Sequence, residues 1–271
     1  NAERIKHSIF VICFPKALRR SKNIRTTAVY REGLQLLYSF GEEYIMLLDL
    51  IRGGNALSVF MGVCVSAFVV FCLMPIHEYA HALVATKLGD QTARLSGRLT
   101  LNPMAHIDIW GAVMILLVGF GYAKPVPVNV RNTKMKNKKL AMALIALAGP
   151  LSNLIFGFFS VLVRYVFLLA VSKRGGEMTT AVFALDAFFQ YSAIININLA
   201  VFNLIPIPPL DGSRILFAIL PNKFYFGIMK YERYIMIAMF LLLLTGALTT
   251  PLSYLSNLVY NAFNKLFYSI F

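Results

Sequence analysis

His77, Glu78 and His81 form an HExxH motif, whose residue types and spacing are those of a zinc site. Residues four apart on a helix differ by roughly 40° in rotation and about 6 Å in rise, so both imidazoles can bind one ion. The Glu78 carboxylate, beside that face, can act as general base toward an activated water. The alternative is a chance match, but ionisable residues embedded in apolar sequence are costly and functional by default.

The motif follows directly on an apolar stretch, residues 55–76, that is long enough to cross a bilayer. The chain is 58% hydrophobic and only 14% charged, which excludes an ordinary soluble domain. Three further stretches have the length of a spanning helix and two are weaker candidates: 139–172, 186–210 and 234–250, then 107–123 and 252–271. We therefore expect an all-α polytopic membrane protein with about five to six transmembrane helices.

Two regions are expected. Residues 1–54 form a basic N-terminal region, in which the acidic and apolar residues of 34–51 favour an interfacial amphipathic helix over a full span. Residues 55–271 form the membrane domain, with its core at 55–214. The three cysteines have no paired spacing, so neither a disulfide framework nor a cysteine zinc site is expected.

The segment after the motif helix is expected to form a short membrane-associated hairpin or re-entrant region. The helix should end near Leu88, before Gly89, and ARLSGRLTLNP should be a short hairpin or loop. The alternating prolines of YAKPVPVNV require an extended, edge-like segment. Such a segment could bind an unwound substrate by strand addition or only plug the site, and the sequence does not decide between the two.

The net charge of +14 is spread beside the apolar stretches and is not gathered in one basic domain. This favours anionic lipid at the cytoplasmic face over nucleic acid as the partner. The cluster between Arg131 and Lys139 predicts a cytoplasmic loop. If the motif helix runs inward and 107–123 dips in and returns, Asp211 reaches the depth and side of the two histidines. The basic N-terminus fits this topology only if 34–51 also crosses.

A catalytic zinc site needs a third protein ligand. Few acidic residues follow the motif: Asp90, Asp108, Glu177, Asp186, Asp211 and Glu232. Asp211 follows an apolar stretch interrupted by three prolines, and an unwound segment at membrane depth is tolerated only where it lines a cavity or packs inside protein. The alternative for PPLDG is a membrane-exit turn. With the HExxH motif present, we favour Asp211 as the third ligand.

Five segments together resemble the site-2 protease family of intramembrane zinc metalloproteases. They are HEYAH at 77–81, GRLTLNPMAHID at 97–108, GYAKPVPVN at 121–129, AGPLSN at 148–153 and NLIPIPPLDG at 203–212. The resemblance implies a three-helix core that holds one Zn²⁺ through His77, His81 and Asp211, with Glu78 activating water. It also implies cleavage of membrane-anchored protein substrates at a transmembrane segment, with the active site toward the cytoplasmic side.

The resemblance gives several further residues candidate roles. Asn203 matches a position expected to contact the substrate or the transition state, whereas interhelical hydrogen bonding is its alternative. Gly149 and Asn153 fit a small-residue helix contact, and Pro209 helps to break the helix before Asp211. His106 is favoured as a loop-ordering residue over a fourth imidazole near zinc. The chain resembles the compact branch without a peptide-binding insertion or a regulatory domain, so the membrane core, its loops, or a regulator or adaptor protein should select substrates.

Two other functions stay open at this point. One is a membrane metalloprotease of another family, whose third ligand is a glutamate such as Glu177. The other is a non-catalytic zinc-binding membrane protein or transporter that uses the same histidines. Transport usually needs further polar residues along a path, and the apolar stretches after residue 212 contain almost none.

Overall fold

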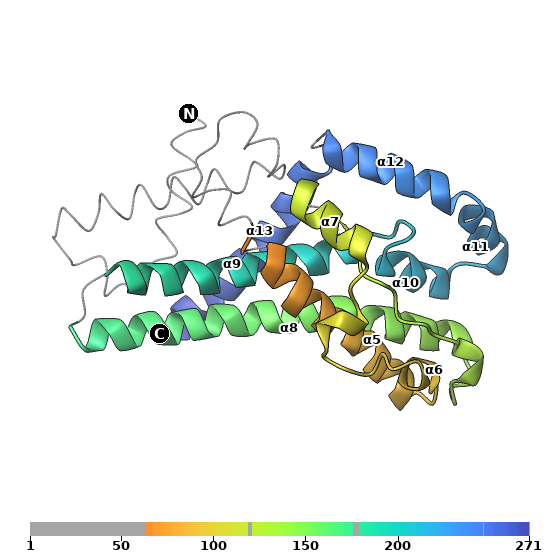
Figure 1. Ribbon diagram of the computed structural model, residues 1–271, viewed down its shortest axis with the longest axis horizontal. Coiled ribbons are helices and arrows are strands. Elements are labelled where there is room, and N and C mark those ends of the chain that lie inside the picture. Colours follow the sequence, from red (N-terminus) through yellow and green to blue (C-terminus); the bar gives the residue numbers. More distant parts are fainter. Residues whose placement is uncertain (1–62, 65, 119–120, 176–178, 246, 271) are drawn as a thin grey trace.

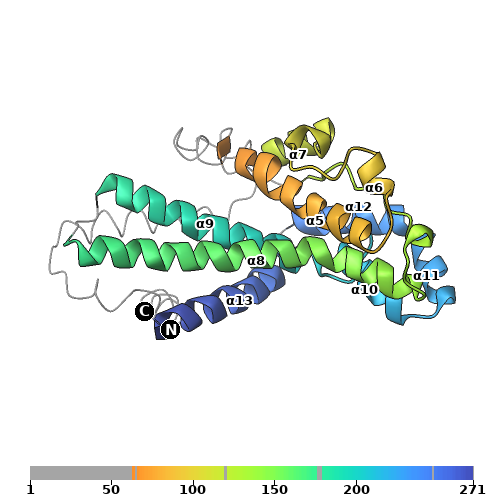
Figure 2. The same cartoon turned by 90° about the horizontal axis from the view of Figure 1, so that it is seen from below.

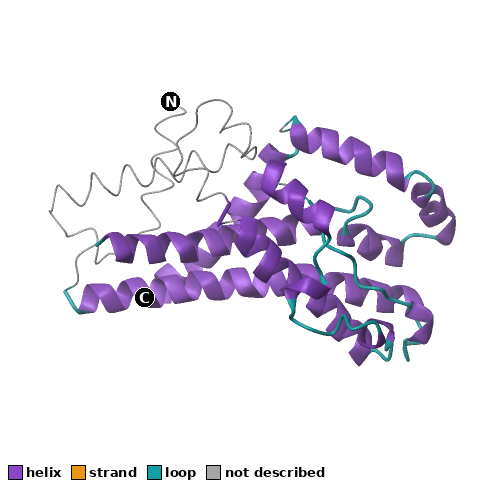
Figure 3. Cartoon of the chain, in the orientation of Figure 1, coloured by secondary structure: helices purple, strands orange, loops and turns teal. Residues whose placement is uncertain are grey.

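The computed structural model describes residues 63–64, 66–118, 121–175, 179–245 and 247–270. Within these ranges the chain is helical and contains no strand (Figure 3), which confirms the all-α prediction. The predicted N-terminal region, with its amphipathic helix at 34–51, lies outside the described residues.

The helices follow one another along the chain with short connections. They are the π-helix η2 (Val69–Leu73), α5 (Met74–Lys87), α6 (Thr92–Leu95), the 3₁₀ turn η3 (Pro103–Ala105), α7 (Ile109–Val118), the 3₁₀ turn η4 (Val130–Asn132), α8 (Lys138–Lys173), α9 (Thr180–Asn203), α10 (Asp211–Ile219), α11 (Asn222–Met229), α12 (Glu232–Leu244) and α13 (Thr249–Ile270). Of the hairpin or loop predicted at ARLSGRLTLNP, the structure has the loop, which follows the short helix α6.

Three helices in the described part of the chain are long and apolar enough to cross a membrane: Ser66–Lys87, Lys138–Lys173 and Ala181–Asn203. The first extends beyond the predicted stretch 55–76 because the HExxH motif continues the same helix. The third ends at Asn203, ahead of three prolines that cannot continue it. The predicted stretch 234–250 is divided, because α12 ends at Leu244 and α13 begins at Thr249.

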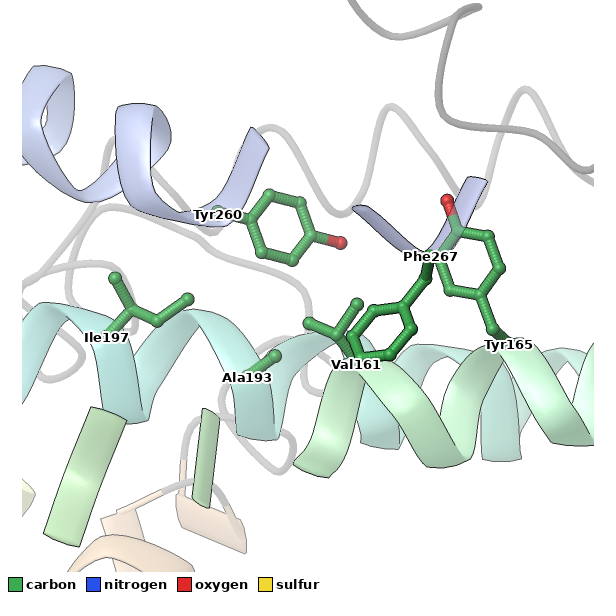
Figure 4. Packing of buried hydrophobic residues seen from close by; sticks show 6 residues of the cluster. All are labelled: Val161, Tyr165, Ala193, Ile197, Tyr260 and Phe267. Carbon is green, nitrogen blue, oxygen red and sulfur yellow. The ribbon is translucent and has the colours of Figure 1, made fainter. Parts of the chain in front are cut away.

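Helices α8 and α9 lie side by side, α13 crosses them, and α5 packs against the half of α8 that is nearer its N-terminus (Figures 1 and 2). One core cluster joins α8, α9 and α13 through Val161, Tyr165, Ala193, Ile197, Tyr260 and Phe267 (Figure 4). Helix α10 packs on α8 as well. Helix α8 is therefore the axis against which the motif helix and α10 are placed.

One face of α8 carries a continuous row of exposed apolar side chains. They recur every three or four residues along the helix: Leu140, Leu144, Leu147, Leu151, Ile155, Phe159, Val163 and Val166. A soluble monomer rarely exposes so large an apolar surface. A lipid-facing helix requires it, so the stripe agrees with the membrane placement inferred from the length of α8.

The helix that carries the motif is irregular where it begins, because Pro75 lies in its first turn. Pro75 has no amide hydrogen, so the regular ladder is interrupted there. The preceding turn widens into η2, in which the Met74 amide donates to the Val69 carbonyl five residues back. The helix then runs regularly through the motif and ends at Leu88, before Gly89 with φ of +105°, as the sequence predicts.

Candidate metal centre

Two histidines of α5 and an aspartate distant from them in sequence meet between α5, α8 and α10. The Nε2 atoms of His77 and His81 are 3.1 Å apart, and each lies 3.2 Å from Oδ2 of Asp211. Ligands held about 2.0 Å from a tetrahedral zinc lie about 3.3 Å from one another. The three donor atoms therefore form one face of a tetrahedron of the size that zinc requires.

The chemistry of the donors also indicates a cation. His81 Nδ1 lies 2.7 Å from the carbonyl oxygen of Ile145, to which it must donate. In the neutral imidazole, Nε2 of His81 then carries a lone pair. That lone pair faces the Asp211 carboxylate, which is also an acceptor, so a proton or a metal cation must lie between them. The Ile145 carbonyl fixes the ring in the orientation that a metal ligand needs.

Gly149 allows α8 to lie directly against the two imidazoles. A Cβ atom at this position would be 2.3 Å from His81 Nε2 and 2.5 Å from His77 Nε2. No side chain can be accommodated there without displacing the rings. Gly149 is predicted from the sequence as a small-residue helix contact, and the groups that lie closest to it are the two imidazoles of the histidine pair.

Asp211 is placed by the first turn of α10. Helix α9 ends at Asn203, the prolines turn the chain, and Asp211 is the first residue of the next helix. The lack of a side chain at Gly212 allows the chain to turn back closely on the end of α9. A Cβ atom at this position would lie 2.2 Å from the carbonyl oxygen of Leu204. The buried Pro208 and the exposed Pro209 lie within this turn.

Glu78 lies next to the histidine pair and is half-buried. Its Oε2 accepts a hydrogen bond of 3.2 Å from the backbone amide of Val126. Among the described residues no hydrogen bond involves Oε1. One oxygen of the carboxylate is thus held by the protein while the other is available to a reacting group.

Three further residues that the sequence singles out are also described: Asn203, Asn153 and His106. Asn203 is half-buried and donates to the Leu199 carbonyl one turn back, within its own helix. Asn153 is buried one turn beyond Gly149, and neither polar atom of its side chain has a hydrogen-bond partner in the described part of the chain. His106 stands apart from the centre, because its Nε2 bonds to the Thr100 carbonyl at 2.8 Å. The prediction of a loop-ordering role for His106 is confirmed.

Three of the other acidic residues described are engaged elsewhere, and Glu232, the first residue of α12, is not part of this group of donors. Asp90 accepts hydrogen bonds from Thr92 and Asn129, Asp108 accepts backbone amides at the start of α7, and Asp186 pairs with Arg164. Glu177 lies outside the described residues. Within those residues, the three donors at this centre form the one group of three metal-ligating side chains close enough to share an ion.

Comparison with known proteins agrees with this geometry. The model of peptidase family M50 matches residues 65–246, about two thirds of the chain. The chain belongs to peptidase family M50. The matched residues include the HExxH helix, α8 and Asp211, so the family match and the three-residue centre coincide.

Three similar proteins carry the printed name putative zinc metalloprotease. YwhC of Bacillus subtilis is 41% identical over 196 residues, which are 72% of this chain and 87% of YwhC. Rip2 of Mycolicibacterium smegmatis is 30% identical over 172 residues, covering 60% of this chain and 59% of Rip2. A protein of Methanocaldococcus jannaschii is 30% identical over 143 residues, covering 52% and 62% of the two chains. No solved structure was found to match.

Two features of the centre were missed from the sequence. The contact between Glu78 and the Val126 amide joins residues 48 positions apart, and backbone donors leave no mark in side-chain patterns. Asp90 was considered only as a candidate ligand, whereas it is fully buried in a hydrogen-bond network. Its position two residues before Thr92, in a loop, was an available signal for an aspartate that binds local backbone amides.

Proposed function

We propose that this M50 protein is an intramembrane zinc endopeptidase that hydrolyses peptide bonds in or near the transmembrane segments of membrane proteins. The observation that carries the proposal is the triangle of three acceptor atoms beside Glu78. Two of these atoms, with Glu78, are on a helix long enough to cross a membrane. Family membership and the names of the relatives support it.

His77, His81 and Asp211 would hold one Zn²⁺. When bound, the metal supplies Lewis acidity that polarises the scissile carbonyl and lowers the pKa of water. Glu78 takes the proton from the attacking water through its free oxygen and then gives it to the leaving amine. His77, His81 and Gly149 are buried, so bulk water has little access to the groups that would hold the metal.

Substrate binding is proposed for Asn203, which ends α9 eight residues before Asp211. Its amide already donates to Leu199, so its side-chain oxygen is the group free to accept from a substrate. Membrane-anchored proteins are the proposed substrates and the lipid bilayer is the medium in which they are reached. A regulator or adaptor protein is proposed as a further partner, and nucleic acid is not.

The proposed topology is multi-pass, with five to six spans, a re-entrant segment at α7 and the active site toward the cytoplasmic side. The basic cluster Arg131–Lys139 leads into α8, and Gly149 lies eleven residues beyond Lys138, which is about 16 Å along the helix. The metal centre would therefore be nearer the basic, cytoplasmic end. At ten residues, α7 is too short to cross and would dip in and return.

The test uses purified protein in detergent and a single-span reporter labelled on both sides of its transmembrane segment. Glu78→Gln should retain about one zinc per chain and lose cleavage by at least about a thousandfold, since the general base is removed. Asp211→Asn should lose both zinc and cleavage. Zinc is measured by atomic absorption and cleavage by gel.

Two results would overturn the assignment. If Glu177→Gln abolished zinc binding while Asp211→Asn kept it, the protein would be a membrane metalloprotease with a glutamate ligand. Suppose instead that the wild-type protein binds zinc, and that Glu78→Gln leaves the cleavage of every membrane-anchored substrate tested unchanged. The non-catalytic zinc-binding alternative would then hold.

A further inference from the structure

The non-helical segment Lys124–Asn129 lies against the helix that carries Glu78. Its central residue, Val126, is 9% exposed and donates its amide hydrogen to Glu78 Oε2. Pro125 and Pro127 flank it, and proline has no amide hydrogen and a fixed φ. These three residues therefore present a single backbone donor, and that donor is directed at Glu78. We call residues 124–129 the Glu78 clamp.

The first end of the clamp is fixed by the preceding loop. The amide of Lys124 donates to the His106 carbonyl at 2.9 Å. Arg98 Nη1 donates to the Lys124 carbonyl at 3.3 Å and also to the Ala105 carbonyl. Arg98 is 8% exposed, and a buried guanidinium bound to backbone carbonyls is a costly arrangement unless it orders the chain.

The second end is fixed by Asp90, whose exposed fraction is zero. Asp90 Oδ2 accepts the Asn129 amide at 2.6 Å, and Oδ1 accepts the Thr92 amide at 3.0 Å. Asp90 lies three residues after the end of α5, and its own amide donates to the Ala85 carbonyl of that helix at 3.0 Å. The clamp is therefore tied by hydrogen bonds to the same helix that carries Glu78.

Apolar packing holds the middle of the clamp. Val126 packs with Ala82 and Ala93, and Val128 lies against the same cluster. Ala82 is four residues after Glu78, so the two share one face of α5. The Val126 side chain and the Val126 amide thus contact neighbouring turns of the motif helix.

We propose that the Glu78 clamp is a positioning element for the catalytic base, with Val126 as the direct donor and Asp90 and Arg98 as the residues that hold its two ends. This inference rests on the proposed peptidase function. The Val126 amide fixes one carboxylate oxygen and turns the other toward the reacting water. A base held in one orientation spends no time in unproductive rotamers, which is how hydrogen bonds outside the metal site support catalysis.

The test compares two substitutions at one position. Val126→Pro removes the amide hydrogen and keeps an apolar residue, whereas Val126→Ala keeps the amide and removes most of the packing. We expect Val126→Pro to lower kcat about tenfold to hundredfold, the effect of losing one hydrogen bond to a charged group. KM and zinc content should stay within about twofold of the wild type. Val126→Ala keeps the amide donor and should therefore lower kcat clearly less than Val126→Pro does, in spite of the lost packing.

A second replacement keeps the test decisive if Val126→Pro does not fold. The α-hydroxy analogue of valine, introduced at position 126 by nonsense suppression, changes the amide to an ester and removes only the N–H donor. The control is valine introduced by the same method. A lower kcat with unchanged zinc content supports the inference. Unchanged kcat, a parallel loss of zinc, or an equal loss in Val126→Ala would overturn it.

The result is separable from the proposed function. If the wild-type protein cleaves no membrane-anchored reporter although it is folded and binds zinc, the peptidase proposal fails. If the wild type cleaves the reporter and the amide-free variants cleave it equally fast, the peptidase proposal stands and only the role of the clamp is refuted.

Discussion

Two clusters of buried ionisable side chains lie along α8, and they differ in whether their charges balance. Arg164 on α8 and Asp186 on α9 form a bidentate pair, with N–O distances of 2.7 and 3.3 Å. About 22 Å away along the same helix, Gly149 lies against His77, His81 and Asp211.

The comparison shows what distinguishes a structural cluster from a functional one in this protein. In the Arg164 pair, the donors and the negative charge are both supplied by the chain, so the cluster is complete and joins two helices. Around Gly149 the described residues supply acceptors and a carboxylate but no permanent cation. The cluster whose negative charge and acceptors are not balanced by a positive charge is the one expected to bind a cation.

The largest effect is expected from filling the space at the incomplete cluster. Gly149→Ala would place a methyl group 2.3 Å from His81 Nε2 and 2.5 Å from His77 Nε2, so the rings must move and the metal ligands separate. We expect zinc affinity and the rate of cleavage each to fall by about a hundredfold. This is the upper end of the range for changes that disturb the orientation of metal ligands. Zinc per chain is measured after dialysis against a weak chelator.

The matched control is Gly157→Ala, two turns along the same helix. Its Cβ would lie 3.0 Å from Cγ1 of Ile197, the end of a side chain that can shift. Zinc content should therefore be near normal. Stoichiometric zinc in Gly149→Ala would refute the idea that the two imidazoles need the bare backbone of α8.

The complete cluster should respond in stability and not in metal binding. Arg164→Met leaves the Asp186 carboxylate buried without its partner, which typically costs about 3 to 5 kcal/mol. The double variant Arg164→Met with Asp186→Leu removes both charges and should recover most of that loss. Thermal unfolding in detergent measures the stability, and zinc content should stay normal in both folded variants. A double variant as unstable as the single one would show that packing, not charge balance, governs this site.

The sequence was sufficient to single out the three side chains that meet at the candidate metal centre, because each carries a strong local signal. HExxH specifies two histidines and a base at fixed helical spacing. Prolines before Asp211 mark an irregular turn at the end of an apolar helix. The all-α fold was predictable for a similar reason, since apolar stretches of this length have few alternatives in a membrane.

What sequence reasoning could not supply is the set of contacts that depend on three-dimensional approach. The prolines around Val126 predict an extended, edge-like segment, and the structure has a non-helical segment there that belongs to no sheet. Nothing local shows that the Val126 amide faces Glu78. Arg164 and Asp186 are twenty-two positions apart in different helices, so their pairing depends on how α8 and α9 pack. The predicted helix at 234–250 failed because apolar composition does not locate the break between α12 and α13.

The smallest expected effect tests a third polar cluster, centred on Asp90, which the chain completes with hydrogen bonds. Burial alone would raise the pKa of the Asp90 carboxyl, but hydrogen bonds from Thr92, Asn129 and Asn132 outweigh burial and keep the pKa below its ordinary value of 3.8. Since the carboxylate is favoured in the folded state, it stabilises the fold above the ordinary pKa, and this contribution is lost as pH falls through the lowered value.

Asp90→Asn should therefore reduce stability by about 1 to 3 kcal/mol at pH 7, and the difference from the wild type should shrink as the pH falls below 3.8. Thermal unfolding between pH 7 and pH 3 measures it. Asp108→Asn is the matched control, because asparagine caps the start of α7 about as well as aspartate does. A difference for Asp90→Asn that stays constant with pH would mean that the shape of the Asp90 site matters and its charge does not, which would place this cluster apart from both clusters on α8.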